Sequence, residues 1–487
     1  MAGVVGAGPS GWPSARFSIG PVPRRAELIA VAAVLLGFLA MALVLLAERG
    51  PLGHDEAVYA LRAETFRLGE PAGSTWAGYR APGLPFVAQF AGSSEAGMRL
   101  VTTGFGLVLL VATWIFGRLL FGPAAGVTAA AGVALTPLIL RSSVQIWPDV
   151  PGAALGMLAI AVLACSTAGD RVSWWAFAVP PLVGAATIVR FGAPANLAFG
   201  LGAVALWRLE AIRRSPVRAV AAGVLSAVAA AVVLLVPSAT GNDPAPLSAI
   251  GARSREWFEG FADFAVRAGE LIGSPAGVAL LTGVVAAVLL ARRGRIPRGA
   301  LAAALGGGVG SGLITAVLLH GELRYLAPTI PLLWAAAGAG LAGLAAVVTL
   351  PRAEAGVLAA ALLGAMVVSA LDLGYEANRV NKARYSSVRT AAERVGEAAA
   401  GGSCGVVTGY GPQVGWYSGC LVAGFPGSGP TPPRWLESRS DVVFLFRVED
   451  GKRQPEASAW REAADDGALQ RIFAVDEGDV VVYRYRG

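Results

Sequence analysis

Long apolar runs recur along the chain and are separated by shorter polar segments. The hydrocarbon core of a bilayer is about 30 Å thick, and one helical crossing takes roughly 20 apolar residues. The runs that approach this length span residues 26–47, 98–120, 123–140, 151–168, 174–190, 192–207, 219–237, 276–291, 299–319, 326–349 and 355–371. The pattern predicts an α-helical polytopic membrane protein with about eleven transmembrane helices.

Composition supports the same class. The 487 residues are 55% hydrophobic and only 15% charged, and the mean hydropathy is +0.61. A soluble domain carries about 25% charged residues. The first apolar run continues through Leu46, which is longer than the apolar region of a cleaved signal peptide, about 7 to 15 residues. We therefore expect the first helix to remain in the mature protein.

Basic residues predict the orientation in the membrane. Arg24 and Arg25 precede the first run, and the basic segments 208–218 and 292–298 link later runs. With eleven crossings these segments fall on one side, which the positive-inside rule assigns to the cytoplasm. The net charge of +7 is explained by this topology, and no basic face indicates a nucleic-acid partner. We expect a multi-pass plasma-membrane protein whose N-terminus is cytoplasmic and whose C-terminal domain is extracytoplasmic.

The polar sequence on the outer side gathers in four loops, at 48–97, 141–150, 238–275 and 320–325. In the third loop Trp257, Phe258, Phe261 and Phe264 recur at helical spacing among charged residues. This pattern is typical of a helix lying in the membrane interface, or of a packed loop helix.

Hydropathy falls after the last run, which divides the chain into a transmembrane domain at 1–375 and an extracytoplasmic domain at 376–487. A helix is expected over 386–400, followed by strand-like runs. The last of them, RIFAVDEGDVVVYRY, predicts a hairpin around Glu477 and Gly478. These features predict a small α/β domain.

Two of the three cysteines, Cys404 and Cys420, lie in the exterior domain, and Cys165 lies in an apolar run. An oxidising exterior favours a disulfide between Cys404 and Cys420, and buried free thiols are the alternative. The chain has two histidines and no CxxC pattern, which argues against a structural zinc site.

Acidic residues stand at the outer ends of two predicted helices. Asp55 and Glu56 follow the first run in GHDEAVYALRAE, and Asp149 lies in QIWPDVPGAAL. A solvated loop acid is the ordinary interpretation of any one of them. All three face the same side, however, and the first two share a loop with YRAPGLPF at 79–86. These acids are therefore candidates for acid–base chemistry.

Two arginines also reach the outer side at the ends of apolar runs, Arg190 in TIVRFGAP and Arg324 in HGELRYLAP. An arginine close to hydrocarbon is costly unless it is paired, so each marks a candidate site. The planar guanidinium suits a phosphate at the level of the lipid head groups. An internal salt bridge, such as Arg324 with Glu322, or snorkelling to the interface are the alternatives.

In order along the chain, these segments resemble those of GT-C type polyprenyl-phosphate-dependent integral membrane glycosyltransferases, in the branch of the protein O-mannosyltransferases and aminoarabinose transferases. The similar segments are the acid pair after the first helix, YRAPGLP, the Asp-x-Pro at Asp149, and RYLAPTIP. The resemblance covers about residues 1–375. It departs at Pro82 and Pro85, which are separated here where the family often has consecutive prolines.

The resemblance implies a polyprenyl-phosphate-linked sugar as donor and a hydroxyl on a protein, lipid or glycan as acceptor. It implies that Asp55 is the acidic residue of the first outer loop that lies at the catalytic centre, that Glu56 is structural or positions the acceptor, and that Asp149 lies near the same centre. Arg190 and Arg324 would bind the donor phosphate. The other candidate substrate contacts are Tyr79, Arg80 and Tyr325, although Tyr79 also suits the aromatic belt of the interface. No cofactor is certain, and a divalent metal held by the carboxylates stays open.

In such a transfer, positive charge develops on the sugar and negative charge on the leaving phosphate. Asp55 would accept the acceptor's proton in a single displacement that inverts the anomeric centre. Two other functions are compatible with the composition. One is a multi-pass transporter or lipid flippase, which would place its polar site near the bilayer midplane. The other is a noncatalytic cell-envelope assembly subunit.

Overall fold

The computed structural model describes residues 23–69, 80–239, 274–318, 323–348, 351–399, 401–449, 451, 453–476 and 479–486. The chain divides into two compact units. The first comprises the described residues of Met1–Leu43, Thr103–Ser143 and Pro148–Leu373, and the second those of Val44–Thr102, Val144–Trp147 and Gly374–Gly487.

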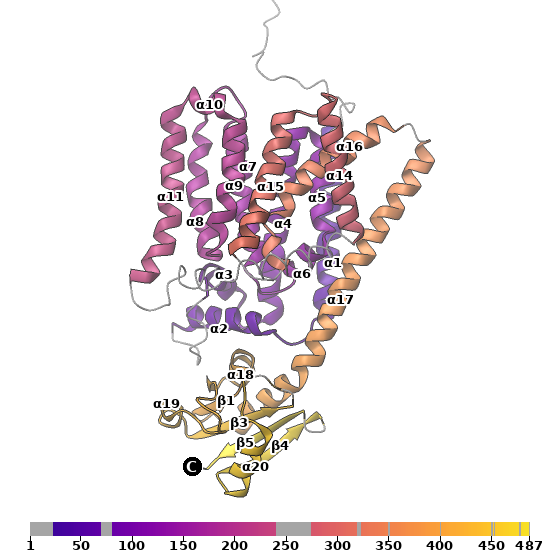
Figure 1. The fold of residues 1–487 in the computed structure, drawn as a ribbon. Coiled ribbons are helices and arrows are strands. Elements are labelled where there is room, and N and C mark those ends of the chain that lie inside the picture. The colour runs from indigo at the N-terminus through magenta and orange to yellow at the C-terminus, as the bar shows by residue number, and fades with distance from the viewer. Residues whose placement is uncertain are drawn as a thin grey trace, which may run out of the picture. The chain divides into compact units, whose positions relative to one another are not determined.

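The first unit is helical (Figure 1). Three helices contribute residues to both units: α1 (Arg24–Ala47), α4 (Glu95–Phe121) and α17 (Arg352–Ala398). The other elements of the first unit are α5 (Pro123–Ala134), α6 (Pro137–Ser143), α7 (Asp149–Ser166), η3 (Trp174–Ala178), α8 (Val179–Val189), α9 (Ala193–Trp207), α10 (Leu209–Arg213), α11 (Pro216–Ala239), α14 (Pro275–Arg292), α15 (Arg298–Leu318), η4 (Leu323–Leu326) and α16 (Ile330–Val347).

Within the described residues, eight helices are long and apolar enough to span a membrane, or nine if the bent pair α5 and α6 forms one span. Two further apolar segments are shorter, Trp174–Val189 and Ala193–Trp207. These helices account for all eleven runs predicted from the sequence. The predicted fold class, a polytopic helical protein with a small C-terminal sheet domain, is confirmed.

Small residues allow the helices of the first unit to pack closely. A Cβ added at Gly340 of α16 would collide with the Gly283 carbonyl of α14, so these two backbones are in direct contact. Such contacts are typical of membrane helices, which gain little hydrophobic energy from associating. On α16, buried Trp334 donates its indole N–H to Thr136 Oγ1 at 2.9 Å. Glycine contacts and a few buried polar bonds thus hold this bundle.

The second unit contains three short helices of the first predicted loop, α2 (His54–Leu68), α3 (Gly83–Ala88) and η2 (Gln89–Ala91). It also contains a five-stranded sheet in the order β2-β1-β3-β5-β4. β1 (Cys404–Val407) runs parallel to β2 (Leu421–Ala423) and β3 (Val442–Val448), and β5 (Val480–Tyr485) runs antiparallel to β3 and β4 (Leu469–Val475). Its remaining helices are α18 (Gly411–Ser418), α19 (Arg434–Glu437) and α20 (Ala457–Asp465).

The sheet has an apolar core on each face. The last turns of α17 cover one face through Val388, Ala391 and Val395, and Trp460 of α20 lies in the core of the other. The helix expected over 386–400 is thus the end of the much longer α17. Cys404 and Cys420, the pair considered for a disulfide, are bonded. The strands of the expected last hairpin pair as β4 and β5, although its turn residues Glu477 and Gly478 lie outside the described residues.

Candidate active site

Asp55 stands in the first turn of α2. A carboxylate is favoured there because the helix dipole and free backbone N–H groups attract negative charge. Asp55 Oδ1 lies 2.5 Å from a guanidinium nitrogen of Arg80, and the two side chains are 18% and 19% exposed. The Arg80 carbonyl in turn accepts a hydrogen bond from Arg62. Asp55 is therefore held in one orientation while part of its carboxylate remains accessible.

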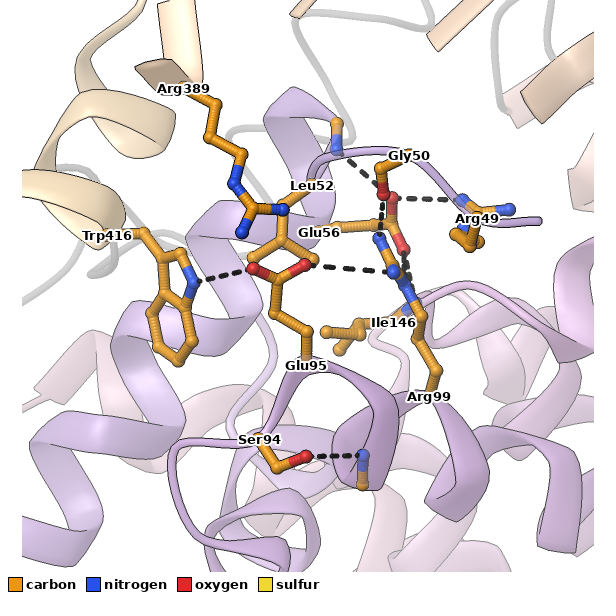
Figure 2. A network of polar contacts seen from close by, with 12 residues as sticks. Arg49, Gly50, Leu52, Glu56, Ser94, Glu95, Arg99, Ile146, Arg389 and Trp416 are labelled. Carbon is orange, nitrogen blue, oxygen red and sulfur yellow. Dashed lines mark hydrogen bonds and ion pairs between the residues drawn. The ribbon is translucent and has the colours of Figure 1, made fainter. Parts of the chain in front are cut away.

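The neighbouring Glu56 is buried and fully engaged (Figure 2). Its carboxylate accepts hydrogen bonds from Arg49 at 3.0 Å and Arg99 at 3.1 Å, and from the backbone N–H groups of Gly53 at 3.1 Å and Ile146 at 3.2 Å. Burial alone would raise the pKa of Glu56, but the two arginines and the Gly53 N–H outweigh it and hold the pKa at about 2. Glu56 is thus permanently charged at neutral pH.

The two adjacent acids therefore have different environments. Glu56 joins the start of α2 to the segment before it and to Arg99 of α4, which suits a positioning role. Asp55 has the exposure that a reacting group needs. The pKa of His54 beside them is lowered from its ordinary value, chiefly by partial burial.

In the first unit, Asp149, Arg190 and Arg324 form a buried charged cluster. Asp149 begins α7, Arg190 follows the last residue of α8, and Arg324 lies in η4. The three residues are 1%, 6% and 7% exposed. A terminal nitrogen of Arg190 lies 3.2 Å from Asp149 Oδ1, and Arg324 Nε lies 3.7 Å from Asp149 Oδ2. The structure thus brings together three residues that the sequence singled out separately.

Tyr325 completes this cluster. The Arg190 guanidinium lies 5.0 Å from the centre of its ring, and the Arg324 guanidinium lies 5.5 Å from it. Both distances are within the range of cation–π attraction. One aromatic ring therefore helps to hold two like-charged groups near each other.

Arg190 retains hydrogen-bonding capacity. Its contact with Asp149 brings the charges close without hydrogen-bond geometry, and neither terminal nitrogen of Arg190 has an acceptor among the described residues. Buried donors without acceptors cost free energy. Two guanidinium groups and one carboxylate give this triad a net charge of +1. A phosphate would supply both the missing acceptors and the compensating charge.

Gly152, one turn after Asp149, makes room for the arginine. A Cβ at this position would lie 3.1 Å from Arg190 Cβ and 3.5 Å from Arg190 Cδ. The aliphatic part of Arg190 therefore runs directly over the Gly152 backbone of α7 on its way to Asp149. Sequence reasoning missed this residue, because one glycine among many in an apolar run carries no distinct signal.

Sequence reasoning also missed the two arginines that bind Glu56. Arg99 stands at the start of a predicted span, where an unpaired charge is costly, so its position in the sequence indicated that it has a partner. Other predicted contacts lie outside the described residues: Tyr79, Glu322, and the aromatic residues of the 238–275 loop. In the part of the chain that the structure describes, no three His, Cys, Asp or Glu side chains are grouped as a metal site.

Comparisons with known proteins identify the fold. The family model for dolichyl-phosphate-mannose-protein mannosyltransferases matches residues 84–237. ArnT from Cupriavidus metallidurans in the apo state superposes with a TM-score of 0.61, over 93% of this chain and 98% of that chain, at 17% identity. The same protein bound to undecaprenyl phosphate gives a TM-score of 0.64, over 95% and 98%, at 15% identity. The chain has the GT-C fold.

A more distant GT-C structure also matches. The oligosaccharyltransferase AglB from Archaeoglobus fulgidus, in complex with an inhibitory peptide and a dolichol-phosphate, has a TM-score of 0.51 over 85% of this chain and 69% of that chain, at 13% identity. Among curated proteins, none matches the chain in sequence. The resemblance to polyprenyl-phosphate-dependent GT-C glycosyltransferases is confirmed.

Proposed function

We propose that this GT-C protein transfers a sugar from a polyprenyl phosphate to a hydroxyl acceptor on the extracytoplasmic side of the plasma membrane, in one inverting displacement. The observation that carries the proposal is the buried Asp149, Arg190 and Arg324 cluster, in which two Arg190 nitrogens find no acceptor among the residues that the structure describes. A structural neighbour with the same fold was crystallised with undecaprenyl phosphate. The cluster has the charge and donors that such a phosphate requires.

The leaving phosphate gains negative charge as the glycosidic bond breaks. Fixed positive groups in a water-poor setting stabilise such charge more strongly than the same groups do in water. Arg190 and Arg324 are buried and oriented by Asp149 and Tyr325, so they need little reorganisation during the reaction. Their role is to bind the donor phosphate and stabilise it as it departs.

The acceptor hydroxyl must lose a proton as its oxygen attacks the anomeric carbon. Asp55 is the group that we assign to receive it, because its carboxylate is oriented by Arg80 and is partly accessible. A carboxylate is a weak base for an alcohol, so the proton should move late, as the new bond forms. Attack from the face opposite the phosphate inverts the anomeric centre.

Sugar transfer to membrane extracts from a panel of radiolabelled polyprenyl-phosphate sugars tests the proposal. We expect turnover with the wild type and a loss of about 10²- to 10³-fold in Arg190→Gln, the range found when one transition-state donor is removed. Arg190→Lys should be intermediate, since an ammonium keeps the charge and loses the planar fork. Arg292→Gln is the matched control, because that arginine is exposed.

Two outcomes would count against the proposal. If no donor is turned over but proteoliposomes move labelled polyprenyl phosphate across the bilayer, the protein is a flippase. If Arg190→Gln and Arg292→Gln transfer sugar equally well, the buried cluster does not bind the donor phosphate.

Gly152→Val is expected to reduce transfer by about 10-fold or more, because its side chain would displace Arg190 and a small misplacement of a binding group is costly. The effect should appear in the donor KM as well as in kcat. Gly104→Val is the control, since Gly104 is also helical and a Cβ there meets nothing within 4 Å. Equal activity of the two variants would show that the position of Arg190 is not critical.

A further inference from the structure

The second unit contains a cavity of about 470 Å³, lined by both polar and apolar groups, that the proposed reaction does not use. Its walls come from α2, the start of α4, the last turns of α17, and α18 with the residues that follow it. The volume is in the range of small-molecule sites, about 300 to 1,000 Å³. The side chains that matter for recognition are Glu64, Glu95, Arg389, Glu393, Trp416 and Tyr417.

Two aromatic residues line the cavity, and Trp416 is the one whose ring is not packed against the core of the sheet. Tyr410 and Tyr417, from the same GYGPQVGWYSGC segment, pack against the apolar core of the sheet. Trp416 is half-buried in the cavity wall, and its indole N–H points at Glu95 Oε1, 3.4 Å away (Figure 2). The ring is therefore fixed at one edge and contributes to the cavity surface.

The backbone around Trp416 is held in place on several sides. Gly415 brings α18 against α2, where its Cβ position lies 3.6 Å from Leu61 Cδ1. Gly419 ends α18 in the left-handed conformation, with φ of 69°. The next residue, Cys420, is fastened to Cys404 of β1 by the disulfide. This wall is thus preorganised, which lowers the cost of binding a ligand.

The charge of each cavity carboxylate is partly offset by a neighbouring arginine. Glu64 pairs with Arg67, Glu95 lies 3.7 Å from Arg99, and Glu393 bonds Arg389 at 2.7 Å. A carboxylate has about four acceptor sites, so each pair retains capacity for further hydrogen bonds. The cavity therefore offers acceptors, the donors of Arg389 and an aromatic face, and neighbouring arginines reduce its negative charge. This set suits a neutral polyhydroxylated ligand better than a cation.

Tyr417 adds rigidity next to Trp416. Its hydroxyl oxygen accepts a hydrogen bond from the Leu52 N–H at 2.7 Å, and the Arg389 guanidinium lies 5.0 Å from the centre of its ring. Burial, with the nearby Glu95 carboxylate, raises the pKa of Tyr417, so it stays protonated at physiological pH. The same residue thus links the cavity wall to the chain that leads into Asp55.

We propose that this cavity is a saccharide-binding site that holds a neutral sugar unit of the acceptor. Only the assignment of the bound saccharide to the acceptor rests on the proposed transferase function. Sugar binding at Trp416 is a separate property of the cavity, and it can be measured without turnover.

Saturation-transfer difference NMR on the full-length protein in detergent tests the site directly. The probes are glucose, mannose, galactose, arabinose, N-acetylglucosamine and glucosamine. We expect signals from at least one neutral sugar, weakened about tenfold in affinity in Trp416→Ala, which corresponds to about 1.4 kcal/mol. Trp435→Ala is the matched control, because Trp435 is 40% exposed in the same domain and does not line the cavity.

Glu393→Gln is a second variant that distinguishes a loss of binding from misfolding. This glutamate is 44% exposed, and its replacement keeps the shape of the side chain. It should weaken sugar binding while the elution volume and the disulfide remain as in the wild type. No saturation transfer from any sugar, or equal binding in Trp416→Ala and Trp435→Ala, would overturn the site. Stronger binding of glucosamine than of the neutral sugars would overturn the assignment to an uncharged ligand.

Asp55→Asn separates the two proposals. It should retain sugar binding in the cavity, since Asp55 does not line it. Sugar binding without turnover in the wild type would refute the transferase alone. Turnover in the wild type with unchanged acceptor KM in Trp416→Ala would refute the acceptor site alone.

Discussion

Asp55→Asn is expected to reduce sugar transfer by about 10²- to 10⁴-fold, the usual contribution of a positioned acid–base group. Asparagine has nearly the same shape as aspartate, but its amide cannot take the acceptor's proton. The replacement also removes the charge that faces Arg80 at 2.5 Å. Both groups are partly exposed, so water can compensate for the lost ion pair and the fold should persist.

The measurement is kcat at saturating donor, with expression and elution volume matched to the wild type. The donor KM should change little, since the phosphate contacts are assigned to Arg190 and Arg324. Asp170→Asn is the control, because the Asp170 side chain is 66% exposed and its arginine contact is long, at 3.9 Å. If Asp55→Asn turns over as fast as Asp170→Asn, another group accepts the proton.

Much of the fold could be predicted because a bilayer imposes a length on each apolar run. The break between α5 and α6, which lies inside one predicted run, could not be predicted in this way. There the two helices meet at 64° after Thr136, where Pro137 interrupts the helix. Hydropathy averaged over a window is insensitive to such a bend. A membrane span and a broken segment of the same composition therefore look alike in the sequence.

The candidate residues could be found one by one, but their partners could not. The cost of charge near hydrocarbon identified Arg190 and Arg324, and the structure supplies Asp149, which is remote from both in sequence, as their common partner. The free-energy cost of an unpaired charge near hydrocarbon also applies to Arg99, which the structure pairs with Glu56. Pairing depends on how helices pack, which no spacing rule within one segment reveals.

The different environments of the adjacent acids Asp55 and Glu56 could not be predicted from the sequence either. Asp55 and Glu56 lie in one helical turn, where neighbouring side chains point in different directions. Packing decides that one remains partly exposed beside Arg80 and that the other is buried between Arg49 and Arg99. The difference in their roles follows from this difference in surroundings.

Glu56→Gln is expected to destabilise the protein by about 3 to 5 kcal/mol, the range for removing one partner of a buried ion pair. The side chains of Arg49 and Arg99 are only 2% and 5% exposed, so two buried charges would lose the Glu56 carboxylate, although Arg99 keeps a longer contact with Glu95 at 3.7 Å. Glutamine keeps the shape and two of the hydrogen-bond geometries, but it carries no charge. The loss therefore combines the missing charge with two missing hydrogen bonds, because the amide N–H₂ cannot accept from the donors that face it.

The stability that Glu56 contributes should decrease as the pH falls. The pKa of Glu56 is lowered from its ordinary 4.5 to about 2 in the folded protein. A lowered carboxylate pKa contributes stability that is fully present above pH 4.5 and is lost as the pH falls toward 2. The difference in stability between wild type and Glu56→Gln should therefore be constant near neutral pH. It should shrink through this acidic window as the wild-type carboxylate becomes protonated.

Unfolding midpoints of the purified protein in detergent, measured at pH 7 and at intervals down to pH 3, check both expectations. Glu437→Gln is the matched control, since Glu437 is exposed in the same unit and its charge is solvated. A midpoint for Glu56→Gln equal to that of the control would show that Arg49 and Arg99 find other compensation. A difference that grows as the pH falls would contradict the lowered pKa, because protonation must make the wild type resemble the variant.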